Sequence, residues 1–385
     1  MKIALITDGI YPYVLGGMQK HSYYLAKYLA QQGVEVDLFH YNQSSLDIDV
    51  LDVFTDDEKK NIHSYVLEFP ESIKFPGHYI YRSYKYSEAI YELIRNKTDS
   101  YDFIYTKGFS GWKLISEKKK GKIQCCPIGV KFHGYEMFQV APDFKTKLQH
   151  YMLRPFVRKI SREADVVFSY GGKITELITA LGIKRSRIIE IPSGIESRHV
   201  SNRTSPTNNP VKFVFLGRYE RRKGIEELNE VLLKMARQRQ EICFGFIGPI
   251  PEEKKLNLPG ITYFGEIRNY NDVKNLLIQH DVLVCPSWSE GFPNVILEAM
   301  ASGLAVIATD TGAVSRLVDQ QNGELIKVRN KQELEAALDH LSESALLEPL
   351  KEASLSRIKE NFTWEILISR LIKKIEAIVK QDHGS

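Results

Sequence analysis

The chain opens with KIALITDGIYPYVLGGMQKHSYYLAKYLAQQGVEVDLFHY (residues 2–41), which contains a complete strand, loop, helix and strand. Residues 3–7 are an apolar run that ends at Asp8, and the loop after it carries Pro12. A segment with helical spacing follows the pair Gly16–Gly17, and Gly33 ends it before a second apolar run. The residues at helical spacing are Tyr23, Tyr24, Ala26, Tyr28 and Leu29. Two strands joined by a helix lie parallel in one sheet, so this stretch predicts an α/β fold.

The same alternation of strands and helices is predicted in the second half of the chain. A polar stretch, SNRTSPTNNP (201–210), has the composition of a linker between domains. Five short apolar runs follow it, with helical segments between most of them: Phe213–Leu216, Cys243–Ile247, Ile261–Phe264, Val282–Cys285 and Ala305–Ala308. We therefore predict two Rossmann-like, doubly wound domains, residues 1–200 and 201–364. Ligands of such sheets bind beyond the carboxyl ends of the strands, here in the cleft between the domains.

The composition excludes several classes of protein. The 385 residues are 43% hydrophobic and 26% charged, which is ordinary for a globular chain and unlike a disordered one. No apolar run approaches the roughly 20 residues of a membrane-spanning helix. The first strand turns acidic at Asp8, where a signal peptide would stay apolar. The four cysteines have no metal-ligand spacing, so we expect a cytoplasmic protein with reduced thiols and no metal site.

Positive charge is concentrated in one part of the chain. The net charge is only +4, but residues 107–187 contain 17 Lys and Arg against 6 Asp and Glu. A basic face there would suit nucleic acid or anionic lipid headgroups. The alternative is an ordinary solvated surface around residues 118–120.

Two turns with glycine could hold phosphate. Gly16–Gly17 precedes a helix, whose first N–H groups attract anions, although simple turn geometry is the alternative. In the second half, Gly217–Arg218 ends a strand and Lys223–Gly224 begins a helix. Two cations at such a position suit a diphosphate, and a basic surface turn is the alternative.

The stretch SWSEGFPNVILEA (287–299) places two carboxylates between a strand and a helix. Glu290 lies in the loop, and Glu298 lies about one turn into a helix that starts near Pro293. An ionised carboxylate accepts hydrogen bonds from neighbouring hydroxyls, as a polyol ligand requires. For Glu298 taken alone, an exposed helical glutamate is the simpler interpretation.

Together these motifs resemble glycosyltransferase family 4, the retaining nucleotide-sugar enzymes of GT-B fold. Glu290 and Glu298, with seven residues between them, stand in a Glu-Gly-Phe-Pro-Asn-Val context similar to the family's signature. Gly217–Arg218 with Lys223–Gly224 is similar to its diphosphate site, and Gly16–Gly17 to its N-terminal glycine loop. The similarity runs through nearly the whole chain in the same order.

The resemblance implies a role for each residue. Glu290 would bind the donor sugar hydroxyls, and Glu298 the ribose hydroxyls. Arg218 and Lys223 would neutralise the diphosphate without a metal. His133, in KFHGYE (131–136), matches the family's active-site histidine and would contact the donor sugar. The remaining donor-binding residues would be Gly16, Gly17, Gly265, Ile267, Phe292, Asn294 and Val295, with Gly265 and Ile267 near the nucleobase.

Three positions leave details open. Glu136 could be an acceptor contact or a surface residue. The family commonly has Asn-Gly where this chain has Ser193–Gly194, and Glu where it has Arg316. The second departure lies near the nucleotide-binding face, so the donor class is better supported than the donor's identity.

The resemblance implies transfer of a hexose-type sugar from a nucleotide-diphosphate sugar, with a UDP-sugar as the first guess and no cofactor. The N-terminal domain would hold a saccharide or lipid-linked saccharide acceptor, and a C-terminal helix of about residues 365–385 would pack back on it. The leaving phosphate would accept the acceptor's proton. A nucleotide-sugar 2-epimerase and a catalytically silent scaffold of the same fold are the alternatives, and we expect no nucleic-acid partner.

The basic N-terminal half also suggests peripheral contact with the cell membrane. Basic and apolar residues alternate there: Lys145, Lys147, Arg154, Arg158, Lys159 and Arg162 with Leu148, Tyr151, Met152, Leu153 and Phe156. Such a face could meet anionic headgroups.

Overall fold

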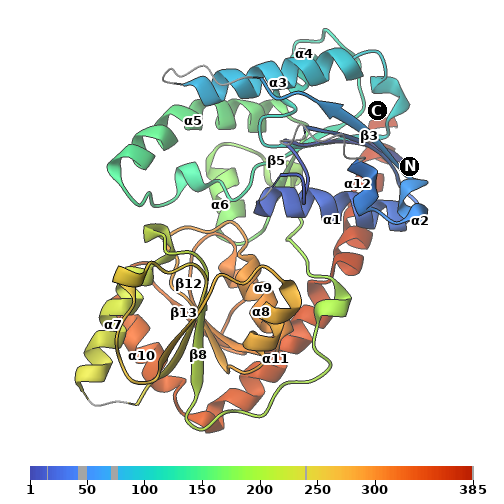
Figure 1. The fold of residues 1–385 in the computed structure, drawn as a ribbon. Coiled ribbons are helices and arrows are strands. Elements are labelled where there is room, and N and C mark those ends of the chain that lie inside the picture. The colour runs from blue at the N-terminus through green and yellow to red at the C-terminus, as the bar shows by residue number, and fades with distance from the viewer. Residues whose placement is uncertain (15, 42–49, 71–76, 239–240, 384–385) are drawn as a thin grey trace.

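The computed structural model contains two parallel sheets, each flanked by helices, one above the other in Figure 1. It describes residues 1–14, 16–41, 50–70, 77–238 and 241–383. Leu15 of the first glycine loop and the last two residues of the expected C-terminal helix lie outside these ranges. The predicted fold class, two Rossmann-like units, is confirmed.

The first sheet has seven strands, and every neighbouring pair is parallel. Its order is β3-β2-β1-β4-β5-β6-β7. The strands are β1 (Lys2–Ile6), β2 (Glu35–Tyr41), β3 (Ile62–Leu67), β4 (Phe103–Lys107), β5 (Ile128–Lys131), β6 (Val166–Ser169) and β7 (Ile188–Glu190). The helices around it are α1 (Gly17–Gln31), α2 (Asp56–Lys59), α3 (His78–Ile94), α4 (Trp112–Lys119), α5 (Phe144–Glu163) and α6 (Lys173–Ala180).

The second sheet has six parallel strands in the order β10-β9-β8-β11-β12-β13. They are β8 (Lys212–Leu216), β9 (Cys243–Ile247), β10 (Ile261–Gly265), β11 (Val282–Cys285), β12 (Ala305–Thr309) and β13 (Gly323–Ile326). The accompanying helices are α7 (Ile225–Arg237), α8 (Tyr270–Leu277), α9 (Asn294–Ala301), α10 (Lys331–His340) and α11 (Leu347–Asn361), and the last helix of the chain is α12 (Trp364–His383).

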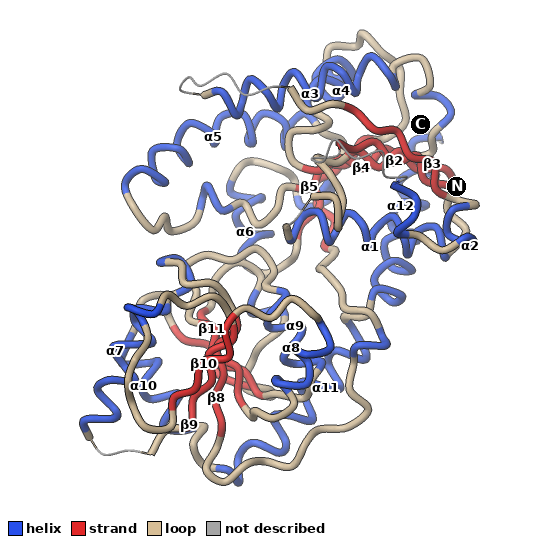
Figure 2. The backbone as a smooth tube through the Cα atoms, in the orientation of Figure 1, coloured by secondary structure: helices blue, strands red, loops and turns tan. Residues whose placement is uncertain are grey.

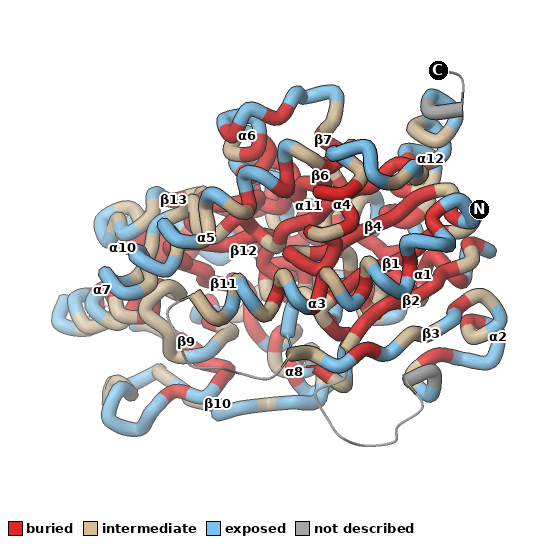
Figure 3. The backbone as a smooth tube through the Cα atoms, turned by 90° about the horizontal axis from the view of Figure 1, so that it is seen from above, coloured by how far each residue is buried: buried red, intermediate tan, exposed pale blue. Residues whose placement is uncertain are grey.

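Both sheets are covered on their two faces, as parallel sheets require. Figure 2 shows the strands of each sheet between helices, and Figure 3 shows that the central strands are buried and the outer turns of the helices are exposed. The edge strands β3 and β10 are the least buried. Among the described helices, none combines the length and the apolar character needed to cross a bilayer.

Each sheet has one point where the strand order reverses, between β1 and β4 and between β8 and β11. Ligands of open α/β sheets bind outside the carboxyl ends of the strands at such points. The loops with Asp8, Gly217–Arg218 and residues 286–293 follow β1, β8 and β11. The fold therefore brings the candidate motifs of the second half to one edge of its sheet.

The chain passes between the two halves at two places that lie side by side. Ile195 and Thr363 form an isolated parallel bridge, where residues 191–200 leave the first sheet and α12 begins. One face of α12 then packs into the N-terminal core with Ile3 and Leu5 of β1. The side chains on that face are Trp364, Leu367, Ile368, Leu371 and Ile375. In Figure 1, α12 lies beside α1, near the N-terminus of the chain.

The sequence analysis missed or shifted some elements. The sequence pattern did not indicate β3, β4, β6, β7 or β13, which are short or carry polar residues. The helix expected near Pro293 begins at Asn294, with Pro293 at its N-cap. A shift of one residue is within the usual uncertainty of a helix end.

Candidate functional site between the two sheets

The two halves touch through two glycines. A Cβ built on either Gly134 or Gly291 would lie 2.7 Å from the Cα of the other. Gly134 follows β5 of the first sheet, and Gly291 follows β11 of the second. No larger residue fits at either position without moving backbone. The loops at the carboxyl ends of both sheets therefore form one site.

Gln139 binds these two loops together. Its Nε2 donates to the carbonyl oxygens of Gly134 (2.6 Å) and Glu290 (2.8 Å). Its Oε1 accepts from the Glu290 backbone N–H at 3.2 Å and from the Thr311 hydroxyl at 3.1 Å. The sequence analysis did not identify Gln139, because a neutral amide in an irregular segment carries no pattern that distinguishes it from a surface residue.

The structure brings Lys223 and Glu290, two of the predicted residues, into direct contact. Lys223 Nζ donates to Glu290 Oε1 at 2.6 Å, and both side chains are largely buried. Arg218 does not join this pair. Its guanidinium is 70% exposed and forms an ion pair with Glu220 at 2.8 Å. One cation and one carboxylate thus lie inside the site, and a second cation lies at its rim.

His133 connects the first glycine loop to the second half of the chain. Its Nδ1 lies 2.9 Å from the Tyr170 hydroxyl, and the Tyr170 ring stacks on Phe292 at 5.5 Å. A Cβ on Gly17 would lie 3.7 Å from His133 Nε2, which places the glycine loop beside the imidazole. Burial, reinforced by the charges of buried lysines nearby, lowers the pKa of His133 to about 3. The imidazole is therefore neutral at physiological pH.

Glu298 lies apart from this cluster, in a small cavity of about 50 Å³ that Asn294 and Lys20 also line. Burial raises the pKa of Glu298 to about 7, and the positive charge of Lys20 opposes the shift. A carboxyl group with that pKa exchanges its proton near neutrality. It can accept hydrogen bonds when ionised and donate one when protonated.

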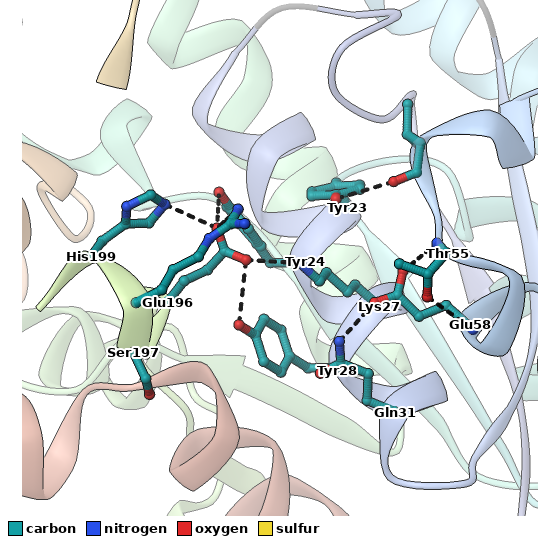
Figure 4. A network of polar contacts seen from close by, with 12 residues as sticks. Tyr23, Tyr24, Lys27, Tyr28, Gln31, Thr55, Glu58, Glu196, Ser197 and His199 are labelled. Carbon is teal, nitrogen blue, oxygen red and sulfur yellow. Dashed lines mark hydrogen bonds and ion pairs between the residues drawn. The ribbon is translucent and has the colours of Figure 1, made fainter. Parts of the chain in front are cut away.

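The same cavity is bordered by a polar network that joins α1 to the crossing between the halves (Figure 4). Its centre is the buried Glu196, which accepts from Lys27 Nζ at 2.7 Å and from the Tyr24 hydroxyl at 3.3 Å. His199 contacts the same carboxylate at 3.2 Å and packs on the Tyr270 ring at 4.0 Å. This network fixes the wall of the cavity opposite Glu298.

Three other predicted residues show no contact that joins them to the Lys223–Glu290 pair. Gly265 ends β10 with a left-handed φ of 74° and accepts from the Gly248 N–H at 2.8 Å. Ile267 and Val295 are partly buried against the large core. Arg316, one of the departures from the family pattern, packs on Gly171.

A larger cavity of about 520 Å³ opens at the carboxyl end of the first sheet, next to the site. Asp8, Arg82 and Ser110 line it together with His133 and Glu136. Burial raises the pKa of Asp8 and that of Glu136, with Lys107 opposing the first shift and Arg222 the second. Asp8 follows β1 directly, and its position after a strand is a signal in the sequence for this cavity beside those of His133 and Glu136.

The expected basic face needs a correction, because two of its lysines are interior. Lys107 and Lys131 are buried on either side of His21, with their Nζ atoms 3.4 Å from Nδ1 and 3.0 Å from Nε2. Each of these lysines ends a strand of the first sheet with its side chain in the interior. A count of charges along the sequence does not show that burial. The Lys131 ammonium also lies over the Tyr170 ring at 4.0 Å. These two charges act on His133 and the glycine loop rather than on a surface partner.

Comparison with known proteins identifies the family. The model of Glycosyltransferase Family 4 matches residues 15–199, and that of Glycosyl transferases group 1 matches residues 210–344. Two facing parallel α/β sheets with a site at their carboxyl edges define the GT-B class. The chain belongs to glycosyltransferase family 4, as its sequence motifs predicted.

The individual relatives either match only part of the chain or share a low sequence identity with it. The chain is 34% identical over 136 residues to the putative teichuronic acid biosynthesis glycosyltransferase TuaC of Bacillus subtilis, a match that spans 35% of this chain and only 34% of that relative. It is 23% identical over 396 residues to the phosphatidyl-myo-inositol mannosyltransferase of Mycobacterium leprae, covering 98% and 97% of the two chains. The structure of sucrose-phosphate synthase from Thermosynechococcus elongatus superposes with a TM-score of 0.76 at 20% identity over 99% of both chains.

Proposed function

We propose that this chain transfers a hexose-type sugar, with retention, from a nucleotide-diphosphate sugar to a saccharide or lipid-linked saccharide. The observation that carries the proposal is the Lys223–Glu290 pair beside the contact of Gly134 with Gly291. A donor held there would lie between the two sheets, with its diphosphate near Lys223 and its sugar near Glu290. Arg218 at the rim would leave Glu220 to take up a second phosphate charge.

The leaving group departs as charge builds on the diphosphate. Lys223, already in a site with little water, stabilises that charge without further reorganisation. The phosphate oxygen then accepts the proton of the attacking acceptor hydroxyl on the same face of the sugar. Glu290 is freed from Lys223 when the diphosphate arrives and accepts hydrogen bonds from the sugar hydroxyls.

His133 would orient the sugar as a neutral hydrogen-bond donor. We assign the Tyr170 hydroxyl, 2.9 Å from Nδ1, as the donor, and in that tautomer the ring proton is on Nε2, the nitrogen that faces Gly17. A neutral imidazole in this tautomer can donate to a sugar hydroxyl without titrating near neutral pH.

The acceptor would enter the cavity that Asp8, Arg82 and Glu136 line, since it opens beside His133. The names of the two relatives above point to cell-surface saccharides and to a phosphoinositide acceptor. We extend this to the present chain as a saccharide or lipid-linked saccharide acceptor, reached from the inner face of the cell membrane.

Mass spectrometry of turnover tests the proposal. Wild type, Glu290→Ala and the matched surface variant Glu252→Ala are incubated with a panel of UDP-, GDP- and ADP-sugars. We expect wild type and Glu252→Ala to release one nucleotide, even by slow hydrolysis, and Glu290→Ala to release at least tenfold less, because it loses contacts to the reacting sugar, each of which contributes about 1.4 kcal/mol or more. Formation of an isomeric nucleotide sugar would support a 2-epimerase instead. No turnover, with no nucleotide raising the melting temperature, would support a silent scaffold.

A further inference from the structure

A second groove lies next to the acceptor cavity, between α3 and α5. Its volume is about 510 Å³, and its lining is mostly apolar. Tyr79, Leu148, Met152 and Leu153 supply apolar surface, and Lys145 supplies one cation. Tyr79 and Leu153 also line the acceptor cavity, so the two spaces share a wall. In Figures 1 and 2, α3 lies at the top of the first half and α5 lies next to it, on its lower side.

The first half of α5 is unusual because its apolar face is exposed. Phe144, Leu148, Tyr151 and Met152 recur at helical spacing and are 41–81% exposed. Pro155 lies inside the helix, and the residues of α5 that are buried all follow it: Val157, Ile160 and Ser161. Eleven large hydrophobic residues are exposed in the part of the chain that the structure describes, and six belong to this face or to the facing start of α3. Contiguous apolar surface of this kind marks an interaction site.

The charges of α5 indicate the chemistry of the partner. Helix α5 contains six Lys and Arg and one acidic residue, Glu163 at its end, and its N-cap is Asp143. Lys145, Lys147, Arg158 and Lys159 are exposed. A second copy of this chain, whose net charge is +4, would bring like charges together. A ligand with an apolar chain and an anionic end would match both the exposed apolar residues and the cations of α5.

We propose that the groove between α3 and α5 binds the hydrocarbon chain of a lipid-phosphate acceptor, with the saccharide in the acceptor cavity and the phosphate between the cation that lines the cavity, Arg82, and the cation that lines the groove, Lys145. This inference rests on the proposed function for the identity of the acceptor, but the groove is a separate binding site. Shared walls at Tyr79 and Leu153 let one molecule occupy both spaces. The cations of α5 bind the lipid phosphate, and the exposed apolar residues of α5 cover the hydrocarbon chain.

Calorimetry with hexyl, octyl and decyl phosphate, below their micelle concentrations, tests the groove without any sugar. Burial of each CH₂ should tighten binding by about fourfold. Leu148→Gln should weaken decyl phosphate binding at least fivefold. Leu93→Gln is the matched control, because Leu93 is an exposed leucine at the far end of α3, 48% exposed against 56% for Leu148. We expect Leu93→Gln to bind as wild type does.

A second variant tests the anionic end. Lys145→Gln should weaken decyl phosphate at least threefold and leave decanol binding unchanged. Three results would overturn the proposal: affinity that does not rise with chain length, equal loss in Leu148→Gln and Leu93→Gln, or a wild-type dimer that Leu148→Gln dissociates in the ultracentrifuge. Sugar release without acceptor should be normal in Leu148→Gln. If the alkyl phosphates do not bind but sugar release is normal, the proposed transfer stands and only the groove proposal fails. If binding depends on chain length but no donor is turned over, the lipid site stands and the proposed function fails.

Discussion

At the scale of single residues, Tyr170 holds the catalytic histidine candidate in one tautomer. We predict that Tyr170→Phe lowers sugar turnover about tenfold, because His133 loses the donor that keeps the proton on Nε2. The measurement is kcat with the donor that the nucleotide-sugar panel identifies. The matched control is Tyr105→Phe, since Tyr105 is also buried and its hydroxyl has no hydrogen-bond partner among the described residues. Equal turnover in both variants would contradict the assigned tautomer.

Glu298 permits a second prediction at this scale, because its pKa is raised to about 7 from 4.5. Between these values the folded state binds more protons than the unfolded state, so this group makes stability fall as pH rises from about 4.5 to 7. Glu298→Gln removes the linkage. We predict that the free energy of unfolding of Glu298→Gln, relative to that of wild type, rises by on the order of 1–3 kcal/mol from pH 4.5 to pH 8. Urea denaturation measures both free energies. A constant difference across this range would mean that Glu298 titrates normally in the folded protein.

The residues that the sequence could predict are those that repeat a local pattern. Glu290 and Lys223 follow strands in glycine-bearing turns, and the structure joins them at 2.6 Å. Gln139 acts only through a contact across the two halves, and no local pattern encodes such a contact. Lys107 was counted with the surface charges, because burial of a lysine depends on the neighbouring elements and not on its own segment.

At the scale of elements, β4 anchors the first turn of α1 through a buried lysine. Lys107 Nζ donates to the Met18 carbonyl at 2.7 Å and to the Ser22 hydroxyl at 2.8 Å. His21 separates it from Lys131, and a neutral imidazole has one donor and one acceptor, so it cannot accept from both ammonium groups. The imidazole therefore accepts a hydrogen bond from at most one of the two lysines. Burial lowers the pKa of Lys107 to about 7, although the charge of Asp8 opposes the shift.

This anchor predicts a rise of stability at alkaline pH. Between pH 7 and 10.5 the unfolded state binds the proton that folded Lys107 has lost, so stability increases with pH by about 1 kcal/mol per unit from this group. Lys107→Met should reduce the increase and leave only the share of Lys131, whose pKa burial also lowers, while the exposed variant Lys234→Met should keep all of it. Urea denaturation at pH 7, 8 and 9 measures the slope. Parallel slopes in wild type and Lys107→Met would show that Lys107 stays charged in the folded state.

Strands and helices could be predicted where they alternate along the chain with glycine or proline between them. The first unit, β1–α1–β2, and the five apolar runs of the second half were predicted nearly to the residue, because glycine and proline mark their ends. The edge strand β3 has the sequence IHSYVL and lies partly in solvent, so it lacks the continuous apolar run of a central parallel strand. Such a strand is stabilised by its partner β2 rather than by its own sequence.

At the scale of the whole molecule, Gln139 couples the two sheets. We predict that Gln139→Ala lowers the free energy of unfolding by about 1–3 kcal/mol and reduces turnover, since it leaves buried groups of Gly134, Glu290 and Thr311 without their partner. Gln279→Ala, on an exposed glutamine with one local hydrogen bond, is the control and should change neither property. Calorimetric unfolding with kcat measures both effects. Wild-type stability in Gln139→Ala would show that the contact does not hold the halves together.

The most direct test of the account is calorimetric binding of UDP, GDP and ADP to wild type, Lys223→Met and Lys234→Met. The account predicts that one nucleotide binds wild type and Lys234→Met equally and binds Lys223→Met at least tenfold more weakly, because a charge-assisted contact to the diphosphate contributes about 1.5–3 kcal/mol. Binding of that nucleotide to Lys223→Met with wild-type affinity, or no binding of any of the three, would contradict a nucleotide-sugar site at the Lys223–Glu290 pair.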